Sequence, residues 1–188
     1  MSRLRVLAAN PRLALGALLT LLLAAGAVIG SGADFTASSA NPANTFASGT
    51  LSIVNSKEGA AVLSASGLRP TGSAVGTVDI ENTGSLSGAF TLSRTTPVDS
   101  DSSNPMSAKL NLTVVDCGTF VGATAPTCGD GDDATKYNGT LSAMSATALG
   151  TYNANVKHRY RFTVVLDGSA GNAYQGDSSS VQFDFNAA

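Results

Sequence analysis

The strongest constraint on the fold is a two-residue alternation of apolar and polar side chains that recurs after residue 47. In residues 158–166, for example, Tyr160, Phe162, Val164 and Leu166 occupy every second position. Successive side chains of a β-strand point to opposite faces, so this pattern is typical of strands with one buried face and one wet face. We predict such strands in residues 48–54, 60–66, 74–82, 88–95, 109–116, 137–141, 158–166 and 179–186.

Turn residues separate these segments, as at Pro70 and Gly72 or at Asn82 and Gly84. Short alternating runs divided by such residues favour antiparallel neighbours. We therefore predict an all-β fold, an antiparallel β-sandwich of about seven to eight strands. Residues 142–155 fit either one helical turn or a loose connection, and no helix of useful length is expected after the leader.

The first 33 residues have the organisation of an export signal. A positively charged start precedes an apolar run at residues 13–29, which ends in four small residues. Ser31 and Ala33, on either side of Gly32, fit the small positions that signal peptidase requires, so cleavage is expected within residues 30–33. A retained membrane anchor is the alternative, because a run of this length just spans a thinned bilayer. We favour a cleaved signal-peptide helix, since no basic stop-transfer cluster follows.

The charge distribution suits an exported protein. Three of the 11 basic residues (Arg3, Arg5 and Arg12) lie in the leader and all 13 acidic residues follow it, so residues 34–188 hold 8 basic residues and a net charge of −5. A nucleic-acid-binding protein needs a clustered basic face, which this composition does not offer. We expect a secreted or cell-surface protein that contacts the membrane only through an uncleaved leader.

Cys117 and Cys128 are the only two cysteines in the sequence. Outside the cell, an oxidising environment favours a disulfide between them. The alternative is two free thiols, or one reactive thiol. A nucleophilic cysteine needs a base, however, and no histidine lies near either cysteine in the sequence.

The sequence offers little catalytic or metal-binding chemistry. The sole histidine, His158, is flanked by two cations, which makes it a poor general base and a poor metal ligand. Asp130, Asp132 and Asp133 form the densest acidic cluster and are the candidates for Ca²⁺ ligands. They lack the full spacing and the closing glutamate of a calcium loop, so a solvated turn is favoured and no cofactor is expected.

Four runs of residues point to a family. They are N-T-F-A-S-G-T-L-S-I (residues 44–53), L-R-P-T-G-S (68–73), V-D-I-E-N-T-G-S-L (78–86) and N-A-Y-Q-G-D-S-S-S-V-Q-F-D-F-N-A (172–187). In this order and behind an export leader, they resemble the TasA/camelysin (CalY) family of exported bacterial matrix proteins. The resemblance covers both ends of the body, whereas residues 96–155 carry little of it.

The resemblance implies a jelly-roll β-sandwich and a leader cut by a dedicated SipW-type signal peptidase. Some members form extracellular fibres of the biofilm matrix by donor-strand complementation, in which the N-terminal segment of one subunit completes a sheet of the next. Carried onto this sequence, the donor is residues 34–47, with Asp34, Phe35, Thr36 and Phe46 as assembly residues. The expected organisation is a signal peptide (1–33), an N-terminal extension (34–47) and a sandwich (48–188).

The expected function is therefore a secreted structural subunit that polymerises with itself. The alternative is a monomeric secreted or cell-surface binding module that uses loops 96–104 and 117–136 as its contact surface. A weaker alternative is a camelysin-like metalloendopeptidase, because some members of the family are described as such enzymes. No zinc-ligand set or catalytic motif in this sequence supports such an activity.

Overall fold

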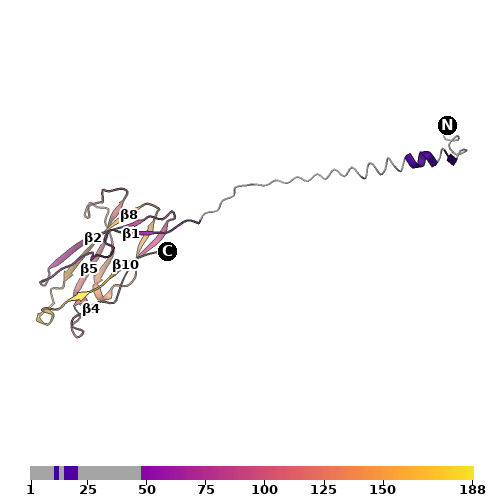
Figure 1. Ribbon diagram of the computed structural model, residues 1–188. Helices are drawn as coiled ribbons and strands as arrows, with labels where there is room; N and C mark the ends of the chain where they lie inside the picture. The colour runs from indigo at the N-terminus through magenta and orange to yellow at the C-terminus, as the bar shows by residue number, and fades with distance from the viewer. Residues whose placement is uncertain (1–10, 13–14, 21–47) are drawn as a thin grey trace. The chain divides into compact units, whose positions relative to one another are not determined.

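The computed structural model describes residues 11–12, 15–20 and 48–188 (Figure 1). The chain divides into two compact units, Met1–Phe46 and Ala47–Ala188. Residues 11–12 and 15–20 are helical, and no helix in the described residues is long and apolar enough to cross a membrane. The second unit contains its own hydrophobic core, which is the property of an independent domain.

Residues 48–188 form an antiparallel β-sandwich (Figure 1). Sheet A has five strands in the order β1-β2-β8-β5-β6, sheet B has three in the order β10-β3-β7, and β4 and β9 form a two-stranded ribbon. The strands are β1 (Ile53–Asn55), β2 (Ser73–Asn82), β3 (Gly88–Arg94), β4 (Val98–Asp99), β5 (Leu110–Phe120), β6 (Ala134–Thr140), β7 (Thr147–Tyr152), β8 (Lys157–Leu166), β9 (Ser179–Ser180) and β10 (Phe183–Ala187). Three 3₁₀ turns connect them: η1 (Met106–Ala108), η2 (Leu141–Ala143) and η3 (Asn172–Tyr174).

The alternation seen in the sequence matches the inward and outward faces of the long strands. Val78 and Ile80 of β2 are fully buried, as are Tyr160 and Phe162 of β8. On the outer face of the same two strands, Arg159 donates two hydrogen bonds to the carboxylate of Asp79, at 2.7 and 2.8 Å. The predicted antiparallel β-sandwich is confirmed. Strands β4 and β7 were not expected, and the single strand expected at residues 179–186 is divided into β9, which pairs with β4, and β10, which pairs with β3.

The predicted strand at residues 48–54 is largely wrong. Only its last part belongs to β1, which pairs with β2 at Ile53 to Asn55. Before that, the carbonyl of Thr50 accepts the N–H groups of Ser85 and Leu86, so the chain follows the turn after β2 instead of a strand. The reason is that β2 ends at Asn82 and the chain then turns, so Ser52 and Thr50 accept hydrogen bonds from the turn residues Thr83 and Ser85 and not from a strand.

Two other expectations also need correction. Residues 60–66 form no strand, although their neighbour β2 has a free edge. Residues 142–155 contain η2 and β7, a strand that the sequence left open; a register shift between Phe90 and Thr91 accommodates Gly150 of β7 at a φ of 126°. The loop expected at 117–136 is shorter, because β5 continues to Phe120 and β6 begins at Ala134.

Candidate functional site

The main concave feature of the sandwich is a groove of about 1640 Å³ along one side. Its walls are residues 57–70 on one side and η3, β9 and β10 on the other, and Val164 and Leu166 of β8 lie at its base. The groove therefore follows the margin of the sandwich where β10 is the last strand of sheet B.

The groove marks the place where the hydrophobic core is incompletely covered. Eleven apolar side chains pack against the core while staying partly exposed, and eight of them line this groove. These eight are Ile53, Val62, Leu63, Leu68, Tyr174, Val181, Phe183 and Phe185. Half-buried apolar surface at this density is typical of a site that binds another apolar surface.

One wall of the groove is an open strand edge. In the ladder between β10 and β3, the backbones of Ala188 and Ala89 exchange two hydrogen bonds, and the carbonyl of Gln182 accepts one from the N–H of Thr95. The backbone N–H and C=O groups of the even-numbered residues therefore point toward β3. By the alternation of an antiparallel ladder, the N–H and C=O groups of Phe183 and Phe185 point to the other side, toward the groove. No backbone partner for these groups occurs among residues 48–188. An unpaired edge of this kind accepts a further strand.

The opposite margin of the sandwich is closed. There β6 of sheet A lies next to β7 of sheet B, and Lys136 Nζ donates to the carbonyl of Leu149 at 2.7 Å. The two sheets are thus joined by a side chain on one margin and separated by the groove on the other. Sheet A has five strands and sheet B has three, so at the open margin strands of sheet A have no strand of sheet B opposite them.

A segment that we call the strap, residues 60–66, forms the outer wall of the groove. Val62 and Leu63 are its half-buried members, and the carbonyl of Val62 lies against the inner face of β2 at Gly76. Apart from a turn bond from Ala60 N–H to Lys57 O, no hydrogen bond joins the strap to any other described residue. The sequence analysis predicted a short strand at residues 60–66, and this prediction is wrong.

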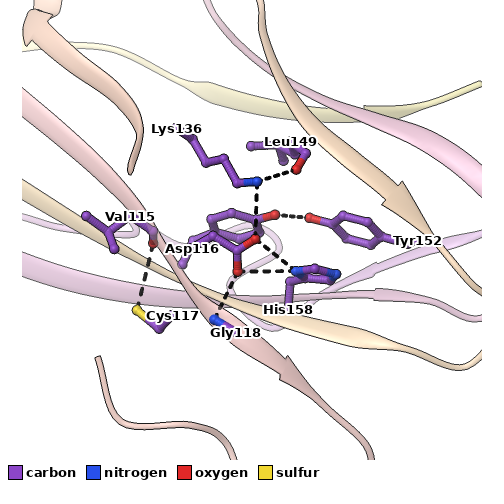
Figure 2. Close-up of polar contacts among 9 residues, drawn as sticks. Val115, Asp116, Cys117, Gly118, Lys136, Leu149, Tyr152 and His158 are labelled. Carbon is purple, nitrogen blue, oxygen red and sulfur yellow. Dashed lines mark hydrogen bonds and ion pairs between the residues drawn. The ribbon is translucent and has the colours of Figure 1, made fainter. Parts of the chain in front are cut away.

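A second candidate is a buried polar cluster between the two sheets (Figure 2). Asp116 lies at the centre, with His158 Nδ1 at 3.0 Å, Lys136 Nζ at 3.5 Å and the N–H of Gly118 at 3.1 Å. The imidazole of His158 also stacks on the ring of Tyr152 at 4.0 Å between centroids. The hydroxyl of Tyr152 in turn hydrogen-bonds that of Tyr160.

Burial and ion pairing act against each other in this cluster. Burial opposes a charge on Asp116, but the hydrogen bond and charge of His158, the Gly118 N–H and the charge of Lys136 outweigh it and hold the pKa of Asp116 below its ordinary 3.8. Burial raises the pKa of Tyr152 and of Tyr160 well above 10, so both phenols stay neutral and hydrogen-bonded. Each of the five side chains in the cluster (Asp116, Lys136, Tyr152, His158 and Tyr160) has at least one polar partner, which is the arrangement of a structural network.

The partners of His158 in the cluster are the carboxylate of Asp116 and the ring of Tyr152. The hydroxyl of Tyr152 is paired with that of Tyr160, and Cys117 is held in a disulfide. Within the described residues, no three His, Cys, Asp or Glu side chains gather as metal ligands would. Sequence reasoning missed the cluster, although Asp116 and His158 both fall on inward positions of their strands.

The cysteine prediction is confirmed: Cys117 and Cys128 form a disulfide with Cα atoms 4.7 Å apart. Cys117 is fully buried and lies at a bulge of β5. The bond therefore fixes the loop after β5 to the inner part of the strand.

The side chains of Asp130, Asp132 and Asp133 do not point toward a common centre. The N–H of Asp132 donates to the side chain of Asp130 at 3.3 Å, while Asp133 turns to Arg161 of β8 at 3.6 Å. The remaining predicted residues, namely Ser31, Gly32 and Ala33 at the cleavage site and Asp34, Phe35, Thr36 and Phe46 in the donor segment, lie outside the described residues.

Comparisons with known proteins add no relative: no protein-family model matches this sequence, and no curated protein is significantly similar to it.

Proposed function

We propose that this protein is a secreted structural subunit that polymerises by donor-strand complementation. Residues 34–47 of one copy enter the groove of the next and pair with β10. The observation that carries the proposal is the open edge of β10 beside a groove lined with half-buried core side chains. A strand supplies what this site lacks, since its backbone pairs with the edge and its side chains cover the core.

The length of the proposed donor suits the groove. At about 3.3 Å per residue, the 14 residues from 34 to 47 extend over roughly 45 Å. The exposed edge of β10 is five residues long, so the donor spans it and leaves a linker of several residues. Its small side chains and its two phenylalanines, Phe35 and Phe46, fit a groove with an apolar base.

In this proposal the occupant of the groove comes from a second copy. The groove begins at Ile53 and Asn55, close to the first described residues of the sandwich, and continues to Met106 and Leu110. Residues 34–47 of a neighbouring copy supply the strand that fills it. Contacts of this head-to-tail kind do not close on themselves and produce a filament.

Export provides the control over assembly in this proposal. While the leader is attached, residues 34–47 are tethered at both ends; cleavage within residues 30–33 by a SipW-type signal peptidase frees the donor. In this proposal the protein is a relative of the TasA/camelysin matrix proteins, and extracellular biofilm fibres are the product of its assembly. No catalytic activity is part of the proposal.

Electron microscopy of two purified chains tests it. The chain from Asp34 to Ala188 is expected to form fibres, and the chain from Ser48 to Ala188 is expected to remain a folded monomer. Since all described strands lie after residue 52, both chains keep the sandwich. Fibres from the shorter chain, or a longer chain that stays monomeric at high concentration, would argue against the proposal.

A further inference from the structure

We infer that the free edge of β2, residues 73–77, is a contact between two copies of this chain, which pair their β2 strands antiparallel across a two-fold axis. Sheet A of one copy then continues into sheet A of the other. No residue of this edge lines the groove, so the contact does not depend on the proposed function.

The outward backbone groups of this edge have no partner in the sandwich. β1 pairs with β2 no further than Ile80, and the N–H of Ser56 then donates to the carbonyl of Asp79 at 3.0 Å. Odd-numbered residues of β2 therefore turn their N–H and C=O groups away from β8. Among the described residues, none bonds to the backbone of Val75 or Thr77 on that side. A row of unpaired groups of this kind is a template for another strand.

The outer side chains of the edge are uncharged and suit a strand pair. Ser73, Val75 and Thr77 share the outer face of sheet A, and all three are exposed. Val75 is 59% exposed, which is unusual for a valine at the middle of a strand. Pairing with a second strand covers this side chain as well as the free backbone.

Charges beside the edge are neutralised within each copy. Arg161 of β8 lies opposite Thr77 in the ladder and pairs with Asp133 at 3.6 Å. Asp79, the next residue on the outer face of β2, accepts two hydrogen bonds from Arg159 at 2.7 and 2.8 Å. Two copies with the same negative net charge therefore meet here without opposing unpaired carboxylates.

The other long strand edges of the sandwich are protected or belong to the groove. On β6, the ammonium group of Lys136 turns inward to Asp116 and to the carbonyl of Leu149 of β7. The ladder of β7 is interrupted by the register shift at Gly150. Inward charges and bulges are features that keep an edge from pairing, and residues 73–77 contain neither.

A two-fold axis at Val75 gives the pairing its register. Val75 then lies opposite Val75 of the second copy, and Ser73 lies opposite Thr77 in both directions. These three residues of each copy offer one N–H and one C=O each, which makes about six hydrogen bonds. The turn from Arg69 to Gly72 and the bond at Asp79 bound the edge, so this register is the one that pairs all three residues.

The contact is a weak one when it acts alone. Five residues from each copy compare with roughly 20–30 residues on each side of a stable interface. An isolated sandwich is therefore expected to stay monomeric at micromolar concentration and to pair only at higher concentration. Two fibres that each present many such edges would associate more strongly, because linked contacts add up.

Sedimentation equilibrium of residues 48–188 tests this inference in the absence of the donor segment. The sandwich is expected to form dimers as its concentration rises from about 20 µM to about 1 mM, the range of weak interfaces. Val75→Lys is expected to raise the dissociation constant about tenfold or more, because like charges then lie opposite each other. Val98→Lys is the matched control: Val98 of β4 is 70% exposed and lies outside this edge, so the variant should dimerise as the wild type does.

An exchange of charges tests the register. Val75→Glu alone should also dimerise poorly, whereas an equimolar mixture with Val75→Lys should recover dimers, since opposite charges then face each other across the axis. In the unaltered sandwich, amide hydrogen exchange measured by NMR should slow at Val75 and Thr77 as the concentration rises. The amides of Ala74 and Gly76, which face β8, should keep their rates.

The outcomes are separate from those that test the groove. A wild-type sandwich that stays monomeric at about 1 mM, or a Val75→Lys variant that dimerises equally well, overturns the contact. A mixture that recovers no dimers overturns the two-fold pairing at Val75. Fibre formation by residues 34–188 tests the proposed function and stands or falls without this edge.

Discussion

The carbonyl oxygen of Val62 occupies the space that a side chain on Gly76 would need: a Cβ there would lie 2.0 Å from it. Glycine at this inward position of β2 is therefore what lets the strap cover the open margin of the sandwich. The absence of a side chain at Gly76 of β2 therefore determines where the strap, one wall of the groove, can lie.

Replacing Gly76 with alanine is expected to displace the strap. The added methyl group meets backbone atoms, which cannot rotate away, so the free energy of unfolding should fall by about 1–3 kcal/mol, as for other overpacked sites. Urea denaturation of residues 48–188 measures it. Gly171→Ala is the control, since its Cβ would meet no atom within 4 Å and its φ of −83° suits alanine. Equal stability of both variants would show that the strap does not rest on Gly76.

Replacing Ala187 with proline is expected to weaken assembly without unfolding the sandwich. Ala187 has the same parity as Phe183 and Phe185, so its N–H faces away from β3, and an edge position of this kind tolerates proline. Loss of one hydrogen bond, worth about 1 kcal/mol, should raise the critical concentration for fibre formation roughly fivefold. Sedimentation measures this concentration. Ala187→Val keeps the N–H and should assemble as the wild type does. If it assembles as poorly as the proline variant, the hydrogen bond from the β10 edge is not the cause of the defect.

The Asp116 cluster is expected to make stability depend on acid pH. The pKa of Asp116 is lowered in the folded state, so its stabilisation is complete above the unfolded value of 3.8 and is lost as the pH falls through the lower folded pKa. Asp116→Asn should reduce the free energy of unfolding by about 2–3 kcal/mol at neutral pH and flatten its decline below pH 4. Urea denaturation of the two proteins between pH 2 and 7 measures the loss of stability at neutral pH and its decline in acid. About three pH values on each side of pH 4 are enough.

Asp132→Asn is the matched control for that experiment. It removes the same formal charge from an exposed loop, where the side chain of Asp132 makes no hydrogen bond to another described residue. We expect it to change the free energy of unfolding by less than about 0.5 kcal/mol. An equal loss in the two variants would mean that overall charge, and not the buried cluster, sets the acid stability.

The disulfide is expected to contribute about 3 kcal/mol, because it closes a short loop in the unfolded chain. The variant with both Cys117 and Cys128 replaced by alanine should unfold at a correspondingly lower urea concentration, with a slope equal to or slightly larger than that of the wild type, because its unfolded chain is less constrained. Its fibres should form normally, since the bond lies on β5, away from the groove. Loss of fibres at full retention of the fold would contradict this separation of roles.

The sequence predicts those parts of the fold in which the two faces of a strand meet different surroundings. Val78 and Ile80, or Phe162 and Val164, alternate with polar residues because one side faces the core and the other water. β7 was not found, since its glycine bulge at Gly150 interrupts the alternation.

The candidate site was less accessible to sequence reasoning. Residues 60–66 were expected to be a strand because they lie between two turn segments, but they form no ladder with any described strand. Asp116 and His158 lie 42 positions apart and form no short motif. Their shared inward parity is the one signal that joins them, and it becomes informative only once the register of β5 and β8 is known.

Fibre length in mixtures of two chains tests the central claim most directly. Residues 48–188 have a groove but no donor, so such a subunit accepts one neighbour and then ends the fibre. Adding this truncated chain to residues 34–188 should shorten the fibres in proportion to the added fraction. Each fibre should carry one truncated copy at one end, which electron microscopy of gold-labelled truncated chains detects. Fibres of unchanged length that exclude the truncated chain, or that incorporate it along their whole length, would contradict assembly through residues 34–47.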